Sequence, residues 1–308
     1  MYLTRPNSTK TGNFYPLLAS NKHRLGTPTR LYCSSLQYRF GVFRRRLLPP
    51  DTLQKSLAMQ NDDSEIKQKK MILYDVPVSN NGARIRSLIY KKKLQDFIQI
   101  RSPMEIGGLS SESYKALNPF GKMPVLELED GSGLPESQVI ETYILDKFSQ
   151  CGPSLIPETP EKRALAALIV RIHDLYMTTI QGCMYKPMDS KSQRAMEIAQ
   201  IAKQLDIIET YCQGPFMCGS EMSYADTAIL PTIVFCNFIL PKFFGWPGIF
   251  EGRPKLQTWW KLMNSDSDTG LVVQEVEGGL ESWNKSKRWE EKGILKDVAD
   301  SSYCWYPN

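Results

Sequence analysis

Side chains that commonly carry catalysis are few in this sequence, and their spacing limits the chemistry available. Histidine occurs only twice in 308 residues, as His23 and His173. A multi-histidine metal site is therefore excluded, and a Ser–His or Cys–His pair could use only His173. A single histidine on an amphipathic helix is more typical of a structural residue. The seven cysteines are scattered and form no C-x-x-C, which disfavours a disulfide framework, a zinc site and a dithiol centre.

Two serines stand near the expected starts of helices, where an anionic ligand could bind. Ser137 follows Glu136 at the beginning of an amphipathic segment, and Ser79 lies in the loop before an earlier helix. The N-terminus of a helix has unpaired N–H groups and the positive end of the helix dipole, so it attracts anions. The alternatives are that Ser137 only caps its helix and that Ser79 is a simple turn residue.

The elements that must position these residues follow from the hydrophobic pattern of the first half of the body. The pattern predicts strands over 71–76, 97–101 and 125–128, with a fourth strand after the turn at 129–131, and helices over 83–92, 111–117 and 137–148. Residues 71–149 therefore read as β-α-β-α-β-β-α, a small sheet that carries helices. The linker that follows begins at Cys151-Gly152-Pro153.

The second half of the body is helical throughout. One apolar stripe runs from Leu165 to Tyr176 and another from Ile198 to Ile208, both at helical spacing. Ser223-Tyr224-Ala225-Asp226 is a capping-box pattern before an apolar helix. The sequence therefore predicts an all-α domain over residues 160–290 and a tail over 291–308.

Charge is divided unevenly along the chain. Residues 1–50 hold nine Lys and Arg and no acidic residue, whereas the remaining 258 residues have a net charge of −4. A basic nucleic-acid-binding surface is therefore not expected on the folded part. Residues 1–70 read as a transit peptide followed by a polar linker, and the Ser, Thr and Pro content favours a chloroplast over a mitochondrion. The alternative is a basic tail that stays attached, in a cytoplasmic protein.

No membrane-spanning helix is predicted from the sequence. The most apolar stretch, from Ala228 to Leu240, has about half of the roughly 20 residues that a span requires. It is also interrupted by Pro231 and Asn237.

Four motifs in order resemble the soluble glutathione transferase superfamily. Three form its glutathione-binding signature in order and spacing: Asn118 to Val125 (NPFGKMPV), the Glu129-Asp130-Gly131 turn, and Pro135-Glu136-Ser137. The fourth is the capping box, which matches the family's helical-domain motif. A later segment, Arg253-Pro254-Lys255-Leu256 with Trp259, is also similar to the family. The similarity covers about residues 71–285 and implies a thioredoxin-like N-terminal domain followed by an all-helical C-terminal domain.

The resemblance assigns glutathione-binding roles to five residues. Met123-Pro124 falls where the family keeps a cis X-Pro bond, which leaves the Met123 N–H and C=O free to pair with the cysteinyl unit of glutathione. The Ser137 hydroxyl and backbone N–H are then expected to hold the γ-glutamyl carboxylate, with Glu136 facing its ammonium. Lys122 is expected near a ligand carboxylate, although a solvated lysine is a comparable reading.

The catalytic group implied by the resemblance is Ser79, with Tyr74 as the runner-up. A hydroxyl near the sulfur and the N-terminus of the first helix both favour the thiolate over a thiol, whose pKa is about 8.5 when free. The cysteine-type relatives are disfavoured because no cysteine occurs between residues 71 and 148. The Asn80-Asn81-Gly82 segment does not match any one class of the family cleanly, so the class within the superfamily stays open.

The resemblance therefore implies an enzyme that conjugates glutathione to small hydrophobic electrophiles. The electrophile pocket is expected between the domains, with Arg171, Tyr176 and Phe238 as candidates, although an aromatic stripe is more often core. No metal is expected, and the resemblance implies a homodimer. The alternative is a non-catalytic binding or assembly module on the same fold, because fold alone does not fix function.

Overall fold

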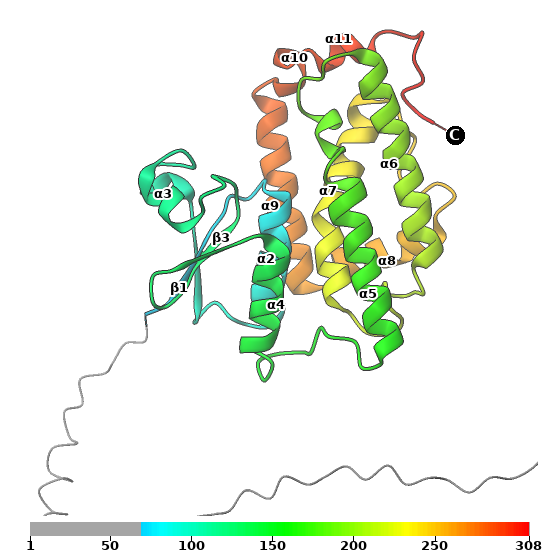
Figure 1. Cartoon of the computed structure of the whole chain (residues 1–308). Coiled ribbons are helices and arrows are strands. Elements are labelled where there is room, and N and C mark those ends of the chain that lie inside the picture. Colours follow the sequence, from blue (N-terminus) through cyan, green and yellow to red (C-terminus); the bar gives the residue numbers. More distant parts are fainter. Residues whose placement is uncertain (1–68, 308) are drawn as a thin grey trace, which may run out of the picture. The chain divides into compact units, whose positions relative to one another are not determined.

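The computed structural model describes residues 69–307, and its first domain is a small sheet flanked by helices (Figure 1). The predictions for the leader and most of the linker lie outside these residues. In chain order the elements are β1 (Met71–Tyr74), α2 (Asn80–Lys91), β2 (Ile98–Arg101), a 3₁₀ turn (Pro103–Ile106), α3 (Glu112–Leu117), β3 (Val125–Glu127), β4 (Gly133–Pro135) and α4 (Ser137–Lys147). This is the predicted order, with a 3₁₀ turn added.

The four strands form one mixed sheet in the order β2-β1-β3-β4. β1 and β2 are parallel, whereas β3 pairs antiparallel with both β1 and β4. Val125 stands opposite Tyr74 on one side and Pro135 on the other. The residues that follow β1, precede β3 and follow β4 therefore lie at one end of the sheet.

Alternation along the strands gives the two faces of the sheet different cores. Met71 and Leu73 pack with Ile85 and Ile140 in the core that α2 and α4 cover. Tyr74, the next residue along from Leu73, points to the opposite face and packs with Tyr114 of α3. Successive strand side chains alternate between faces, so one core lies on each side of the sheet.

The second domain is a bundle of helices, as predicted. Its elements are α5 (Pro160–Ile172), a π-helical turn (His173–Met177), a 3₁₀ turn (Gln181–Met184), α6 (Lys191–Tyr211), α7 (Tyr224–Phe243), α8 (Pro254–Ser265), α9 (Ser267–Lys285), α10 (Arg288–Glu291) and α11 (Ile294–Val298). The segment set apart as a tail in the sequence contributes Ile294 and Trp305 to the bundle's core. A thioredoxin-like domain followed by an all-helical domain is thus confirmed.

Helix α7 forms the centre of this bundle. It runs through Pro231 and Pro241 and begins at the predicted capping box of Ser223 and Asp226. At 20 residues it is longer than the stretch expected from sequence, and by length and composition alone it is apolar enough to cross a membrane. However, 78% of its apolar window is buried inside the protein, which is the pattern of a core helix.

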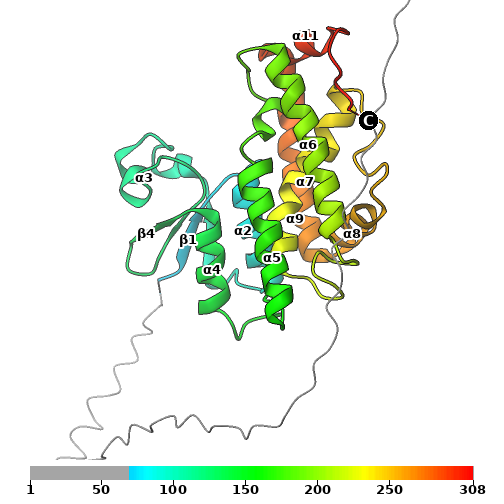
Figure 2. The same cartoon turned by 45° about the vertical axis from the view of Figure 1, so that its right-hand side comes forward.

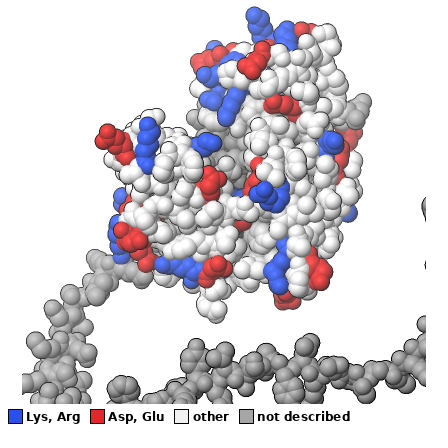
Figure 3. Space-filling model, in the orientation of Figure 1, with Lys and Arg blue, Asp and Glu red and all other residues white. Residues whose placement is uncertain are grey.

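The two domains share a boundary along α2. Figures 1 and 2 show α2 next to α4 on one side and the long helices of the bundle on the other. Ala83 of α2 belongs to the hydrophobic core of the bundle, whereas Ile85 belongs to the core of the sheet. The face of the molecule in Figure 3 carries acidic and basic side chains interspersed, with no basic patch.

Candidate functional site

Ser79 lies at the end of the loop that joins β1 to α2, where it caps the helix. Its hydroxyl oxygen accepts a hydrogen bond from the N–H of Gly82 at 3.1 Å. A hydroxyl that accepts one bond still has its own proton to donate. Ser79 therefore places a hydroxyl group at the positive end of a 12-residue helix, next to the Asp75 carboxylate.

Asp75, directly after β1, is buried beneath this capped turn. One of its oxygens pairs with Arg86, and the other, Oδ1, has no hydrogen-bond partner among residues 69–307. Burial raises the pKa of Asp75 to about 6, against the opposing effects of Arg86 and the nearby Ser79 side chain. The carboxyl is therefore ionised at neutral pH and begins to gain a proton in mildly acidic solution.

The peptide bond between Met123 and Pro124 is cis, as predicted. Ahead of it, the carbonyl oxygen of Lys122 accepts hydrogen bonds from the Tyr114 hydroxyl at 2.7 Å and the Asn118 side-chain amide at 2.6 Å. Within residues 69–307, the Met123 N–H and C=O have no hydrogen-bond partner. The loop is thus held by Tyr114 and Asn118 through the Lys122 carbonyl, while the Met123 N–H and C=O stay free to bind a ligand.

Glu136 and Ser137 begin α4 at the same end of the sheet as Pro124. Glu136 is the N-cap residue, with φ of +69°, and its side chain makes no capping hydrogen bond. Ser137 is the first helical residue and does not cap the helix, contrary to the alternative reading. A non-glycine residue in such a conformation is costly and occurs often at functional sites. The first N–H groups of α4 therefore remain available to a ligand.

A pocket of about 350 Å³ joins these helix starts to the second domain. Its walls include Asn81 from α2, Glu136 and Ser137 from α4, and Arg171 and Asp174 from α5 and the π-helical turn. Glu136 and Asp174 bring negative charge, while Arg171 and the α4 terminus favour anions. This combination suits a small ligand that carries both an ammonium and a carboxylate.

Asp174 is fixed in the pocket wall by a buried polar network. Its carboxylate accepts hydrogen bonds from Arg84 at 3.2 Å and pairs with His173 Nδ1 at 2.8 Å. Burial acts to raise the pKa of Asp174, but the bond from His173 and the charge of Arg84 outweigh it, and the pKa is lowered. Arg84 also forms a bidentate pair with buried Glu141 of α4. Asp174 is therefore an ionised acceptor.

Asn80 connects the start of α2 to the helical domain. Its amide donates to Gln181 Oε1 and to Thr232 Oγ1, each at 2.8 Å. His173 Nε2 lies 2.8 Å from the same Thr232 hydroxyl. Burial lowers the pKa of His173, so the ring is neutral and structural at pH 7. The unusual Asn80-Asn81-Gly82 segment thus has one residue in a domain contact and one in the pocket wall.

Tyr74, the runner-up for catalysis, is engaged on the other face of the sheet. Its hydroxyl donates to Glu127 at 3.2 Å, and its ring meets Tyr114 edge-on at 6.3 Å between centroids. Burial and the Glu127 carboxylate raise the pKa of Tyr74. The Tyr74 hydroxyl therefore has a structural partner, Glu127, which is not one of the residues that line the pocket.

The residues proposed for the electrophile pocket do not gather in one place. Arg171 lies in the pocket described above, beside Glu136 and Ser137. The Tyr176 side chain is exposed, and Phe238 packs beneath the Lys242 ammonium, 4.7 Å from its ring centroid. Lys122 is exposed at the surface.

Several residues of the site had no signal in the sequence. Asp174, Gln181 and Thr232 approach the first domain only because the bundle folds against α2. Asn80 and Asn81 did carry a signal, since their segment matches no single class of the family cleanly. Their position directly after the predicted catalytic serine could have identified these two polar residues as part of the site.

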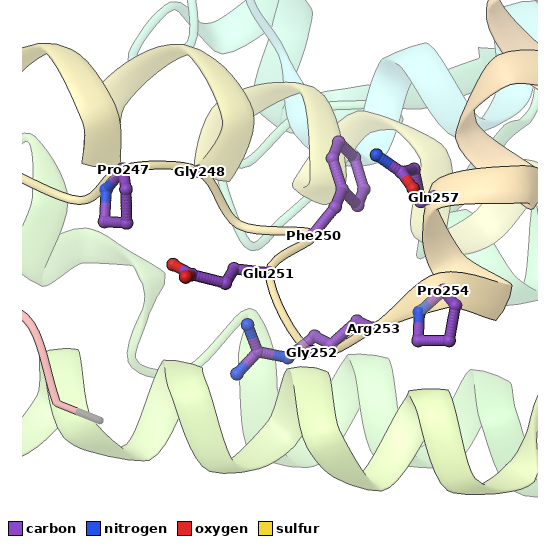
Figure 4. Close-up of a pocket in the computed structure, with 8 residues that line it drawn as sticks. All are labelled: Pro247, Gly248, Phe250, Glu251, Gly252, Arg253, Pro254 and Gln257. Carbon is purple, nitrogen blue, oxygen red and sulfur yellow. The ribbon is translucent and has the colours of Figure 1, made fainter.

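A larger hollow, of about 520 Å³, lies in the loop between α7 and α8, away from these residues (Figure 4). Its one guanidinium, that of Arg253, is already bound to Asp206 at 2.8 Å and to the carbonyl of Ile249 at 2.8 Å. In the described part of the chain, no group of three or more His, Cys, Asp or Glu side chains is arranged to hold a metal.

Comparisons with known proteins agree with this geometry. The chain matches the family model for the glutathione S-transferase N-terminal domain over residues 73–154 and that for the C-terminal domain over 168–269. It is 28% identical to glutathione S-transferase 3 of Zea mays over 202 residues, which are 62% of this chain and 87% of the maize protein. Glutathione S-transferase 2 of Saccharomyces cerevisiae is 25% identical over 222 residues, 68% of this chain and 91% of the yeast protein.

Solved structures show the same fold. Glutathione transferase F7 of Populus trichocarpa superposes with a TM-score of 0.56 at 23% identity, over 67% of this chain and 99% of the poplar chain. Glutathione transferase F2 from the same plant gives 0.58 at 21% identity, over 68% and 99%. Two family models in the right order, the matching relatives and the fold lead to one conclusion: this chain belongs to the glutathione S-transferase family.

Proposed function

We propose that this protein transfers glutathione to small hydrophobic electrophiles, with the glutathione thiolate stabilised by the Ser79 hydroxyl. The observation that carries the proposal is the position of Ser79. Its hydroxyl stands at the N-terminus of α2, and Asn81, two residues later in the first turn of that helix, lines the charged pocket at the start of α4. In this proposal one extended tripeptide spans both places.

In this proposal the γ-glutamyl end of glutathione occupies the pocket. Its carboxylate meets the Ser137 hydroxyl and the free N–H groups of α4, and its ammonium meets Glu136 and Asp174. The cysteinyl unit pairs with the free N–H and C=O of Met123, as an added strand would. These contacts bring the sulfur toward Ser79.

The chemical step needs a thiolate near neutral pH. A donated hydrogen bond from Ser79 and the positive end of α2 lower the thiol pKa, because both favour the charged form. The sulfur lone pair then forms a bond to the electrophilic carbon, and the electrons of the bond that breaks leave with the departing group or move into the adjacent acceptor. Glutathione is a co-substrate here, and the proton that its thiol loses passes to solvent.

The substitution Ser79→Ala tests the role of Ser79. We expect it to raise the pKa of the bound thiol and to lower the conjugation rate at neutral pH by about 10²-fold or more, with glutathione still bound. Ser149→Ala, at an exposed serine after α4, is the matched control. Glutathione binding with an unchanged thiol pKa and rate in Ser79→Ala would refute the assignment.

Calorimetric titration with glutathione separates this enzyme from a non-catalytic module. Saturable binding together with turnover of a model electrophile supports the transferase. Binding without turnover on any electrophile would favour the module, and absence of binding would exclude the glutathione site proposed here.

We also propose a homodimer that uses the exposed side of α4 and the bundle. Large apolar side chains are exposed on α4, α5, the π-helical turn and α6: Val139, Leu168, Leu175, Tyr176 and Met196. Val139 and Leu175 also line the pocket at the start of α4, so Leu168, Tyr176 and Met196 are the residues offered to the interface. Light scattering of the wild type should give twice the chain mass, and Leu168→Glu should reduce it. A monomer mass for the wild type would overturn this part.

The basic leader supports a further proposal, that the chain is imported into an organelle, with a chloroplast favoured over a mitochondrion. Its nine basic residues without an acid in residues 1–50 carry the argument. Residues 1–70 fused to a fluorescent protein should direct it to plastids. Diffuse cytoplasmic fluorescence would show that the leader is not an import signal.

A further inference from the structure

A single buried arginine holds the loop that carries Ser79. All three guanidinium nitrogens of Arg86, on the second turn of α2, donate hydrogen bonds. They reach the carbonyl oxygens of Val76 at 2.9 Å and Pro77 at 2.7 Å, and the carboxylates of Asp75 and Glu275. The arginine is only 2% exposed. It therefore binds three consecutive residues of the loop that ends at Ser79.

The fourth partner comes from the other domain. Glu275 of α9 accepts from Arg86 Nε at 2.8 Å and from the Tyr90 hydroxyl at 2.7 Å. One helical turn later, Gly279 packs directly against Val78, the residue before Ser79. A Cβ at position 279 would lie 2.6 Å from the Val78 Cβ. Helix α9 thus reaches the Ser79 loop in two ways: its Glu275 carboxylate binds Arg86, and its backbone at Gly279 packs against Val78.

If the loop only had to be held in place, apolar packing would do so at a lower cost in free energy than this ionic cluster. Removing an arginine and two carboxylates from water costs free energy that apolar side chains of similar volume would not. The side chain of Asp75 is fully buried and that of Glu275 is 25% exposed. What the charges add is a fixed direction, because a planar guanidinium bonds to several acceptors only in one geometry.

Other titratable groups around the cluster stay neutral at working pH. Tyr90 on α2 and Tyr114 on α3 both feel the Asp75 charge. Burial raises the pKa of both phenols, to about 12 for Tyr114. Arg86 and Glu275 supply charges, and Asp75, with a pKa of about 6, is the group of the cluster that titrates close to the thiol, so thiolate absorbance is the primary readout. An ionisation observed near neutral pH therefore does not come from either of these phenols.

We propose that Arg86 is a positioning residue for Ser79, and that Glu275 of the helical domain, acting through Arg86, sets how well the Ser79 hydroxyl stabilises the glutathione thiolate. The inference rests on the catalytic role proposed for Ser79. Neither Arg86 nor Glu275 contacts the γ-glutamyl pocket, so the effect falls on thiol ionisation and leaves the affinity for glutathione unchanged. In this proposal the helical domain therefore tunes the ionisation of the thiol bound in the first domain.

The test uses Glu275→Gln in the full-length protein. It keeps the shape of residue 275 but removes the charge that orients Arg86. We expect the pKa of the bound thiol, followed by thiolate absorbance and by the pH profile of kcat/KM, to rise, with about a tenfold loss of rate at low pH for each unit. KM for glutathione should not change. Glu281→Gln, an exposed carboxylate on the same helix paired with Lys242, is the matched control.

A double variant separates positioning from a general structural role. If Glu275 acts through Ser79, Glu275→Gln should have no further effect on the thiol pKa in a Ser79→Ala background. An equal shift in both backgrounds, or a raised KM with an unchanged thiol pKa, would overturn the inference. If Ser79→Ala alone leaves the thiol pKa unchanged, the proposed function fails with it.

Arg86→Lys supplies a second probe in case Glu275→Gln folds poorly. Lysine keeps the positive charge but cannot bond to the two loop carbonyls and both carboxylates together. It should raise the thiol pKa in the same direction. A normal thiol pKa in folded Arg86→Lys would likewise contradict the proposal.

Discussion

Gly82 lies directly against the carboxylate of Asp75: a Cβ built at position 82 would come within 1.7 Å of Asp75 Oδ1. The first turn of α2 can therefore approach the end of β1 only if residue 82 has no side chain. The same approach brings the Gly82 N–H to the Ser79 hydroxyl. The Asn80-Asn81-Gly82 segment, unusual in sequence, thus has a packing reason at its third position.

Replacing Gly82 with alanine should destabilise the protein, although alanine is the better helix former. The methyl group must displace the Asp75 carboxylate from Arg86, and we expect a loss of about 1–3 kcal/mol in the free energy of unfolding. Urea denaturation measures it. Gly278→Ala is the control, because this exposed helical glycine has no atom near its Cβ position, and it should gain about 0.5–1 kcal/mol. Equal stability of Gly82→Ala and wild type would contradict the close approach.

The capping carboxylate of α7 should be a major determinant of stability. Buried Asp226 accepts hydrogen bonds from the Met217 and Ser223 N–H groups, the Ser223 hydroxyl and the Trp259 indole, at 2.7 to 2.8 Å. Asp226→Ala leaves these donors buried without an acceptor, which should lower the free energy of unfolding by about 3–5 kcal/mol. Asp96→Ala, at an exposed position, should stay within about 0.5 kcal/mol of wild type. A loss under 1 kcal/mol for Asp226→Ala would refute this role.

Asp75 should leave a signature in the pH dependence of stability. Its pKa is raised from 3.8 to about 6 in the folded protein, mainly by burial. Between these values the folded state binds more protons than the unfolded state, so this group's contribution to stability falls as the pH rises. The difference in unfolding free energy between wild type and Asp75→Asn should therefore decrease from about pH 4 to pH 6. A constant or increasing difference would show that burial does not dominate this pKa.

Asp174 should recognise the α-ammonium of glutathione. Asp174→Asn removes a charged hydrogen bond of about 1.5–3 kcal/mol, so KM for glutathione should rise roughly 10- to 100-fold, with a smaller change in kcat. A glutathione analogue without the α-amino group provides the control, because it should bind wild type and Asp174→Asn equally weakly. If the variant discriminated between the two ligands as well as wild type does, Asp174 would not be the partner of the ammonium.

Local patterns predicted the elements of the first domain and the motifs at its edge. The Met123-Pro124 bond and the start of α4 at Glu136-Ser137 are short-range features, because neighbouring residue types determine them. The electrophile residues were harder to predict for a physical reason. The π-helical turn at 173–177 changes the number of residues per turn, so Tyr176 leaves the buried stripe that ends at Ile172 and becomes 56% exposed.

Contacts between residues far apart in the chain were not accessible from the sequence. Glu275 lies 189 residues beyond Arg86, and Thr232 lies 152 beyond Asn80. Helix α9 has two adjacent glycines, Gly278 and Gly279, which weaken a helical pattern, yet one of them is the point of contact with Val78. The pocket walls therefore depend on how the domains pack, which periodicity alone does not specify.

The bonds from Asn80 to Gln181 and Thr232 have a consequence for recombination. A hybrid enzyme made by a crossover in the linker at residues 151–159 would inherit α2 from one parent and its acceptors from the other. Asn80 would then meet foreign side chains, and Arg86 would face whatever the second parent carries at position 275. Viable hybrids with other members of the family should therefore transfer α2 together with α7 and α9. The segments that must come from one parent thus cross the boundary between the two domains.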